Sequence, residues 1–269
     1  MKVRKHSWIL IPLAIALGVL LGRSGSLQRA LGNNPLLTIA NTADTTWGAV
    51  KAAAFRIYRI NDRGTIHDYL KSHTVRKLQI GAGGNDVDGW LNSDIEPSSK
   101  EIYLDATHRY PFPDGSFQYV FSEHVIEHVS WEGGLAMLRE CHRVLAPGGK
   151  VRTVTPNLTK FIQLLGGVAD PAERQYIDAK LRFHGWPLTP VPGAYILNEE
   201  VRDWGHQFLY DPATLRKSLE LAGFQQINEY PVGEKTDPVF QEAELRTRYP
   251  GSDLWVVNNW EAMAIEATR

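Results

Sequence analysis

The fold is decided by residues 77–85, which read KLQIGAGGN. Residues 77–80 have the length of a short strand, with apolar Leu78 and Ile80 in alternation, and a cluster of glycines follows them directly. Because glycine has no side chain, the backbone there can come close to a ligand, and open α/β sheets bind ligands at the carboxyl ends of their strands. The stretch therefore predicts a first strand that ends at a nucleotide-like ligand. A tight turn without a ligand would also explain the glycines when they are considered alone.

Short apolar runs and helical stretches alternate on the carboxyl side of this turn. Such alternation is typical of a parallel sheet covered by helices. Further strands are expected at 91–95, 102–104, 119–121, 151–155, 225–230 and 254–264, and helices at 132–145 and 212–222. Upstream, Thr65 and Asp68 have the spacing of a capping box that opens a short helix through Leu70. The single cysteine, Cys141, falls on the apolar face of the helix at 132–145, so we expect it to be a core residue.

Two aspartates follow the next two predicted strands. Asp94 ends the strand at 91–95, where a carboxylate can accept charge-assisted hydrogen bonds from both hydroxyls of a ribose. Asp105 follows the strand at 102–104 and could accept a hydrogen bond from an adenine amino group. Each aspartate alone is more often a helix cap or a solvated turn residue. Together with the glycines, however, they put ligand-binding features at three successive strand ends.

Four motifs carry a resemblance to a known family. They are QIGAGGN at 79–85, GWLNSDI at 89–95, FPDGSF at 112–117 leading into FSEH at 121–124, and LRECHRVLAPGG at 138–149. With these motifs the sequence resembles the class I S-adenosylmethionine-dependent methyltransferases, in particular the type 11 group, which acts mostly on small molecules. The last motif is the most specific of the four.

The resemblance implies a fold, an activity and a cofactor site. The implied fold is α/β, doubly wound, with a mostly parallel seven-stranded sheet and helices on both faces, the Rossmann-like methyltransferase fold. The implied reaction transfers a methyl group from S-adenosyl-L-methionine to a small-molecule acceptor. The residues implied at the cofactor are Gly81, Ala82, Gly83 and Gly84 for the methionine part, Asp94 for the ribose with Ile95 next to it, Asp105 and Ala106 for the adenine, and Phe121, Ser122, Glu123 and His124 beside the methyl sulfonium.

Some positions depart from the family pattern. Gln79 stands where many members carry an acid, and Asn85 stands where many carry a third glycine. Asparagine tolerates left-handed backbone, so the turn itself can persist. These departures leave open an alternative function, a catalytically silent cofactor- or partner-binding domain of the same fold. The connection from the glycines to Asp94 is also short, so we expect an abbreviated first crossover helix.

Three histidines are candidates for a catalytic base, His124, His128 and His206. An acceptor that is already nucleophilic needs little acid–base help, because alignment supplies much of the acceleration, whereas a hydroxyl acceptor would need a base. For each of the three, the alternative that it is a surface histidine with no role in catalysis explains its presence equally well.

The run HVIEH at 124–128 also matches the inverted zinc-protease signature, in which two histidines on one helix face bind zinc and the glutamate is the base. A zinc hydrolase using His124, Glu127 and His128 is therefore a third function to weigh. Against it, no third ligand helix is evident, and the run lies at a strand-to-helix junction. A purely structural alternative is that Glu127 and His128 fix the helix start by hydrogen bonds. We expect no metal-binding residues.

Domain organisation follows from composition. Residues 1–23 form a basic and then hydrophobic segment, 24–43 a linker, and 44–269 the methyltransferase domain, with an insertion or lid at about 158–205. At 1.5 Å per residue, residues 8–22 span roughly 22 Å, short of the roughly 30 Å hydrocarbon core of a bilayer. A membrane anchor, a signal peptide and a peripheral helix all stay open, as does orientation. Because S-adenosylmethionine is made in the cytosol, we expect the catalytic domain to be cytoplasmic.

Overall charge bears on the partners. The 269 residues carry a formal net charge of −1, which provides no long-range field that would attract nucleic acid. A lone Cys141 can form neither an intramolecular disulfide nor a cysteine metal cluster. We therefore expect a small-molecule acceptor and no nucleic acid, and the sequence leaves the oligomeric state open.

Overall fold

The structure, a computed structural model, describes residues 62–168, 170–187, 189–234, 237–241, 243–244 and 251–269. The hydrophobic segment at 8–22, the linker at 24–43 and the start of the domain at residue 44 lie outside the described residues, so they stay predictions. Among the helices of the described part, none is both long enough and apolar enough to cross a membrane.

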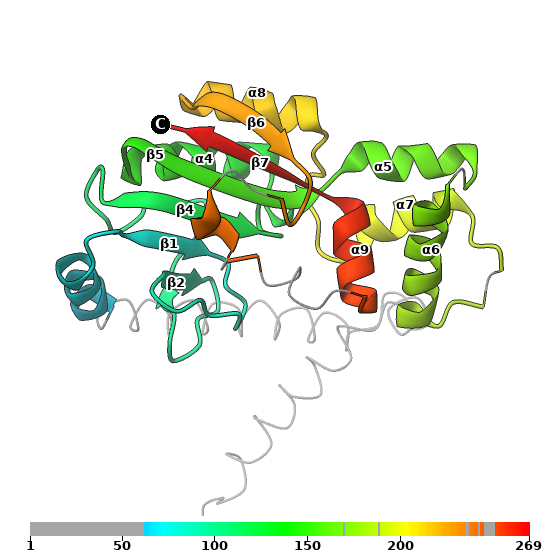
Figure 1. The fold of residues 1–269 in the computed structure, drawn as a ribbon, viewed down its shortest axis with the longest axis horizontal. Helices are drawn as coiled ribbons and strands as arrows, with labels where there is room; N and C mark the ends of the chain where they lie inside the picture. The colour runs from blue at the N-terminus through cyan, green and yellow to red at the C-terminus, as the bar shows by residue number, and fades with distance from the viewer. Residues whose placement is uncertain (1–61, 169, 188, 235–236, 242, 245–250) are drawn as a thin grey trace, which may run out of the picture. The chain divides into compact units, whose positions relative to one another are not determined.

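A seven-stranded sheet organises the described chain, with the strand order β3-β2-β1-β4-β5-β7-β6 (Figure 1). The strands are β1 (Lys77–Ile80), β2 (Leu91–Asp94), β3 (Ile102–Tyr103), β4 (Phe117–Glu123), β5 (Leu145–Pro156), β6 (Gln225–Tyr230) and β7 (Ala262–Thr268). Strands β1 to β5 pair in parallel, whereas β7 runs antiparallel to both β5 and β6. The predicted mostly parallel seven-stranded α/β sheet is confirmed.

The order of the strands reverses between β1 and β4. From β1 the chain moves outward to β2 and β3 and then returns to β4 on the other side of β1, where Ile80 pairs with Ser122. Ligands of open α/β sheets bind at such a reversal, beyond the carboxyl ends of the strands. The glycine turn after β1 and the histidine run after β4 therefore share one edge of the sheet.

The connection between β1 and β2 contains turns and no helix at residues 81–90. The first crossover helix, which we expected to be shortened, is therefore absent from this connection. The Tyr69 hydroxyl links β1 to this connection. It accepts a hydrogen bond from the Lys77 amide at 2.8 Å and lies 3.1 Å from the Gly89 carbonyl oxygen. Tyr69 belongs to a helix at 62–72 that begins before Thr65, so the predicted capping box at Thr65 is wrong.

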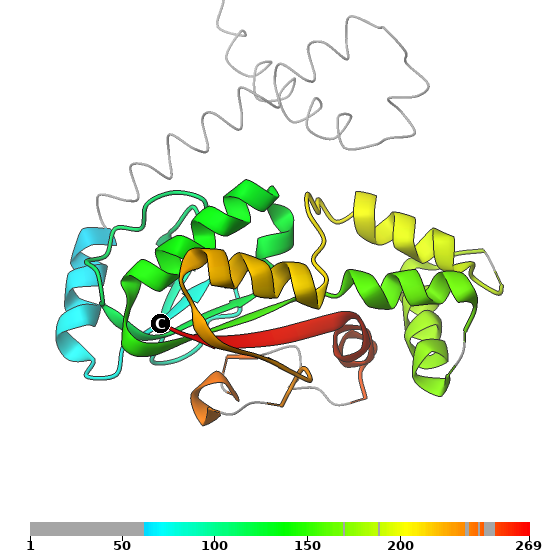
Figure 2. The same cartoon turned by 90° about the horizontal axis from the view of Figure 1, so that it is seen from above.

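Helices α4 (Trp131–Val144) and α8 (Pro212–Ala222) cover one face of the sheet, and the 3₁₀ helix η3 (Pro238–Gln241) lies on the other (Figure 2). Ser130 caps α4 by accepting a hydrogen bond from the Gly133 amide at 3.2 Å. The predicted apolar face of α4 is buried, including Cys141, and burial raises the pKa of its thiol to about 12. The expectation of a core cysteine is confirmed.

The last predicted strand, at 254–264, is wrong over most of its length. A helix, α9 (Asp253–Glu261), occupies it, and β7 begins only at Ala262. Ser252 accepts a hydrogen bond from the Trp255 amide at 3.1 Å, so the segment starts as a capped helix. Strand propensity of an apolar run depends on context, and here the cap and the helical packing outweigh it.

Helices α5 (Leu158–Gln163), α6 (Pro171–His184) and α7 (Gly193–Arg202) lie with α9 beyond the carboxyl ends of β1, β4 and β5 (Figures 1 and 2). They have an apolar core of their own, which includes Phe161, Tyr176 and Ile196. The Trp260 ring of α9 stacks on Tyr176 with the centroids 4.1 Å apart. The segment expected to be an insertion is therefore a packed helical layer next to the ligand edge of the sheet.

Candidate active site

A cavity of about 530 Å³ lies at the ligand edge, between the ends of β1, β2 and β4. The predicted cofactor residues that line it are Gly81, Ala82, Gly83, Asp94, Ile95, Asp105, Ala106 and Glu123. Phe121 and Ser122 are instead fully buried inside the sheet, where the Phe121 ring packs against Trp90. Gly84 lies beside the cavity, and its amide donates to Glu101 at 2.9 Å.

The glycine turn leaves room for a ligand. Gly83 has a φ of +56°, and nothing lies within 4 Å of the position that a Cβ would take there. Gly81 has a different role, because a Cβ at that position would collide with the Val125 side chain. The first glycine thus allows β1 to pack against the loop after β4, and the second borders open space on the cavity.

Asp94 is held in place by the turn that it faces. One carboxylate oxygen accepts a hydrogen bond from the Gly83 amide at 2.9 Å and the other accepts one from the Glu96 amide at 2.8 Å. A carboxylate oxygen has two lone pairs, so each can accept a second hydrogen bond from a ribose hydroxyl. The geometry fits the role that the resemblance implies for Asp94.

Asp105 is likewise fixed by its own loop. It accepts hydrogen bonds from the Thr107 amide at 2.9 Å and the Thr107 hydroxyl at 2.7 Å, and lies 2.9 Å from His108 Nδ1. Burial opposes ionisation, but the donors on Thr107 and His108 outweigh it and hold the pKa of Asp105 below its usual value. An ionised carboxylate at this end of the cavity is a hydrogen-bond acceptor suited to an amino group.

The two departures from the family pattern act on each other. The Gln79 side-chain amide donates to the Asn85 carbonyl at 3.3 Å, which braces the turn. The Gln79 Oε1 atom is buried on the cavity wall and, among the described residues, no group donates a hydrogen bond to it. A ligand that presents a hydrogen-bond donor there, as the amino group of a methionine moiety would, satisfies this atom. These residues therefore fit S-adenosylmethionine.

A second cavity, of about 500 Å³, adjoins the first. The two share Asn85, His124 and His128 in their linings. The rest of the second cavity is formed by the helical layer and the loop after it, and includes Lys180, Phe183, Glu200, Trp204, His206, Asp253 and Glu261. The sequence predicts His206 near the site but gives no sign of the charged residues, because the inward faces of α6 and α7 cannot be recognised from their polar composition.

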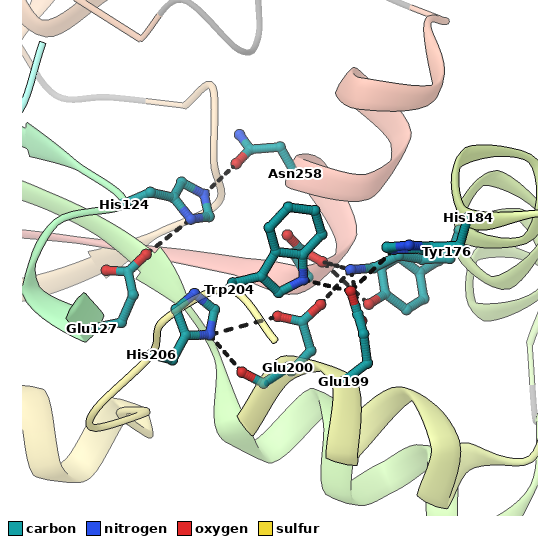
Figure 3. Close-up of polar contacts among 11 residues, drawn as sticks. His124, Glu127, Tyr176, His184, Glu199, Glu200, Trp204, His206 and Asn258 are labelled. Atoms are coloured by element: carbon teal, nitrogen blue, oxygen red, sulfur yellow. Dashed lines mark hydrogen bonds and ion pairs between the residues drawn. The ribbon is translucent and has the colours of Figure 1, made fainter. Parts of the chain in front are cut away.

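His124 is an oriented side chain at the end of β4. Its φ is +52°, its side chain is 8% exposed, and its Nδ1 lies 3.0 Å from Glu127 Oε1 (Figure 3). Its Nε2 lies 2.8 Å from the Asn258 side-chain oxygen. Both ring nitrogens therefore have partners, and Asn258 on α9 is a site residue that the sequence did not predict. Its segment was expected to be a strand.

The inverted zinc-protease arrangement does not form. That signature needs both histidines on one helix face, but the helix here, η1, spans only Ile126–His128, and His124 precedes it with a left-handed backbone. Moreover, Glu127 is fully buried and pairs with His124 instead of standing free as a base. Its other oxygen accepts a hydrogen bond from the Thr155 hydroxyl at 2.9 Å. Although burial opposes ionisation, His124 outweighs it and holds the pKa of Glu127 below its usual value.

His128 and His206 lie side by side, with ring centroids 5.0 Å apart. His206 Nδ1 lies 2.6 Å from the Glu200 carbonyl oxygen, which can only accept, so Nδ1 carries the proton and Nε2 keeps its lone pair. Burial, with a smaller contribution from the other two histidines, holds the pKa of His206 below its usual value. The three predicted histidines are thus together where the two cavities meet.

The far wall of the second cavity carries an excess of buried acid (Figure 3). Lys180 contacts Glu199 at 3.2 Å, Glu261 at 3.5 Å and Glu200 more closely, and all four side chains are nearly inaccessible. One ammonium group faces three carboxylates. Burial first, and then the charge of Glu261, raises the pKa of Glu200 to about 9, so this carboxyl is protonated at neutral pH.

The raised pKa makes stability depend on pH. In the unfolded chain Glu200 releases its proton near its ordinary pKa, but the folded chain holds that proton up to about pH 9, so stability falls as pH rises through this window. Glu200→Gln removes this dependence. We expect the fall in Tm between pH 6 and pH 9 to be smaller in the variant by at least about 2–4 °C, which corresponds to about 1 kcal/mol in a chain of this size. Thermal unfolding of the variant, the parent and the exposed control Glu229→Gln tests this. Equal pH slopes in all three would contradict it.

The strand order and the aspartates around the first cavity are typical of α/β proteins that bind a nucleotide-like cofactor at their switch point. Within that class, residues 91–153 match the family model described as "Methyltransferase domain". The matched segment contains Asp94, Asp105 and the run at 124–128, and the glycine turn lies just before it. The resemblance to the type 11 methyltransferases is confirmed over this segment, and the match supports S-adenosylmethionine as the cofactor.

Several solved methyltransferases are similar to the chain. One from Archaeoglobus fulgidus shares 17% identity at a TM-score of 0.40, covering 80% of this chain and 94% of its own. One from Thermotoga maritima, described as a possible histamine N-methyltransferase, shares 16% identity at a TM-score of 0.43, covering 74% and 87%. One from Mesorhizobium loti shares 16% identity at a TM-score of 0.40, covering 72% and 91%. These TM-scores are low, so the fold assignment stands on the strand order. No curated protein matches the chain.

Proposed function

We propose that this protein transfers a methyl group from S-adenosylmethionine to a small molecule that binds in the second cavity. The observation that carries the proposal is the shared wall of the two cavities, formed by Asn85, His124 and His128. When bound, S-adenosylmethionine supplies an electrophilic methyl group. A volume of about 500 Å³ is in the range of pockets that enclose small molecules.

The chain's own residues would divide the work as follows. Asp94, Asp105 and the glycine turn bind and orient the cofactor in the first cavity. The helical layer borders the second cavity, where Trp204 and Phe183 supply apolar surface against which an acceptor can pack. Alignment of the two ligands then supplies much of the acceleration.

Among the three histidines, His128 is the best placed to take a proton from a hydroxyl acceptor. His124 has partners at both ring nitrogens, and His206, although its Nε2 keeps a lone pair, lines the second cavity and not the first; within the described ranges the His128 ring forms no hydrogen bond. His128 is also exposed and lines both cavities. The family match does not favour the catalytically silent alternative or the zinc hydrolase.

For His128→Ala we expect methyl transfer to fall about 10²–10⁴-fold, the usual contribution of a general acid or base, while the affinity for S-adenosylhomocysteine changes far less. The measurement is incorporation of label from S-adenosylmethionine with a labelled methyl group into a low-molecular-weight metabolite extract, separated from macromolecules by filtration. His67→Ala, an exposed histidine on the helix at 62–72, is the matched control.

The outcomes of this assay separate the candidate functions. Label in the small-molecule fraction that depends on His128 supports the proposal. Label only in the macromolecular fraction would overturn the acceptor class, and cofactor binding without any incorporation would support the silent domain. We further place the catalytic domain in the cytoplasm, because the cofactor is made there. Membrane association through residues 8–22 stays a prediction.

A further inference from the structure

Glu127, His128 and His206 each offer one ligand atom, and these atoms lie within 4.8 Å of one another. The sequence predicts no metal site here, because His206 is far along the chain and only the fold brings it to the other two. Two imidazoles and one carboxylate are a ligand set for divalent transition metals, as in catalytic zinc sites with three protein ligands.

Backbone hydrogen bonds hold the two contributing segments together. The Gln207 and Phe208 amides both donate to the Glu127 carbonyl, at 2.7 and 3.2 Å. The Gln207 side-chain amide donates to the His128 carbonyl at 2.8 Å. These bonds tie the loop that carries His206 to η1, so the three ligand atoms are brought together before any ion binds.

The His206 ring has the tautomer that a metal ligand needs. Its Nδ1 donates to the Glu200 carbonyl at 2.6 Å, which leaves the Nε2 lone pair available. Metal-binding histidines almost always donate their other ring nitrogen to a carbonyl or a carboxylate in this way, since that bond fixes the tautomer and the direction of the ring.

Glu127 supplies a second, independent observation. Its side chain is completely buried, and Oε1 accepts no hydrogen bond of good geometry, although His124 Nδ1 is 3.0 Å away. The other oxygen is held by the Thr155 hydroxyl at 2.9 Å. Oε1 therefore keeps a lone pair that can contact a cation in addition to the neighbouring His124 ring.

We infer that Glu127, His128 and His206 bind one divalent transition metal ion of the zinc class. Three protein ligands leave at least one coordination position open, as in catalytic rather than structural sites. That position faces the junction of the two cavities, since His128 lines both and His206 lines the second. If the proposed function holds, the ion would bind an oxygen of the acceptor, and His128 would be a ligand in the ion-bound protein and the base in the ion-free protein. The binding site itself does not depend on that function.

The test uses the full chain, freed of metal with a chelator and titrated calorimetrically with Zn²⁺. We expect one equivalent to bind, and His206→Ala to weaken binding at least tenfold, because each lost ligand removes a bond to the ion. His128→Ala, at an exposed position, serves if His206→Ala does not fold. The control His67→Ala should bind Zn²⁺ as the parent does. Replacement by Co²⁺ should give visible absorption bands that His206→Ala lacks.

The same samples are titrated with S-adenosylhomocysteine, which separates this inference from the proposed function. Absence of Zn²⁺ binding, or equal binding by the parent and both site variants, would overturn the metal site even if the cofactor binds. Binding of Zn²⁺ that depends on His206 would support the site even if the cofactor does not bind.

Discussion

Asp94→Ala should reduce the affinity for S-adenosylhomocysteine at least about 100-fold. The carboxylate faces the first cavity and is aimed by the Gly83 and Glu96 amides, so both of its oxygens can accept from a ribose diol. Hydrogen bonds to a charged group contribute about 1.5–3 kcal/mol each, and about 1.4 kcal/mol corresponds to a factor of ten in the dissociation constant. Calorimetric titration of the full chain measures the change directly.

Asp88→Ala is the matched control for this variant. Asp88 is an exposed carboxylate in the same connection between β1 and β2, and it does not line the cavity. Its replacement should leave the dissociation constant within about threefold of the parent value, a difference of about 0.7 kcal/mol. Asp94→Asn, which keeps one acceptor oxygen, should fall between the two. If Asp94→Ala bound as tightly as Asp88→Ala, the ribose would have to lie elsewhere.

Arg152→Ala should cause the largest loss of stability. The Arg152 side chain in β5 is fully buried, contacts Glu244 and donates to Glu266 on β7 at 2.8 Å. It also donates to the Glu234 carbonyl at 2.9 Å. Removing the guanidinium leaves two buried carboxylates without their cation, and breaking such a buried pair costs about 3–5 kcal/mol. For a chain of this size we expect Tm to fall by about 10 °C.

Arg182→Ala is the control variant for Arg152→Ala. Arg182 pairs with Asp253 in a similar fork, at 2.6 Å, but both side chains are about half exposed. Exposed ion pairs contribute little to stability, so Tm should change only slightly. Thermal unfolding of both variants at one pH decides the matter. Equal and small decreases in Tm would show that the buried cluster around Arg152 adds no more than a surface pair.

The elements that could be predicted to the residue are those with strong local signals. Strand β1 spans 77–80 as expected, and the glycine turn follows it. Helix α8 spans 212–222 as predicted, because Asp211 caps its start and Gly223 ends it in a left-handed conformation. The segment at 254–264 carried apolar residues that suit either state, and the Ser252 cap decided for a helix. The boundaries of helices and strands could therefore be predicted where a single capping or turn residue determines them.

The candidate site likewise has one part that the sequence predicts and one part that it does not. The first cavity is lined by turns directly after strands, so its Asp94 and Asp105 could be predicted from position alone. The second cavity depends on which faces of α6, α7 and α9 turn inward. That is decided by packing between segments distant in sequence, and nothing local marks Glu200, Glu261 or Asn258 as buried.

The position of β7 in the sheet affects the order in which parts of the protein can fold during synthesis. Strand β7 lies between β5 and β6, and among the described strands β6 pairs with β7 alone. Just before it, α9 carries Asn258, which contacts His124. These residues are synthesised after β6 and after His124, so neither the sheet nor the contact between Asn258 and His124 can form before residues 253–268 have been synthesised. Assembly of the histidine site therefore depends on a residue that is synthesised 134 positions after His124.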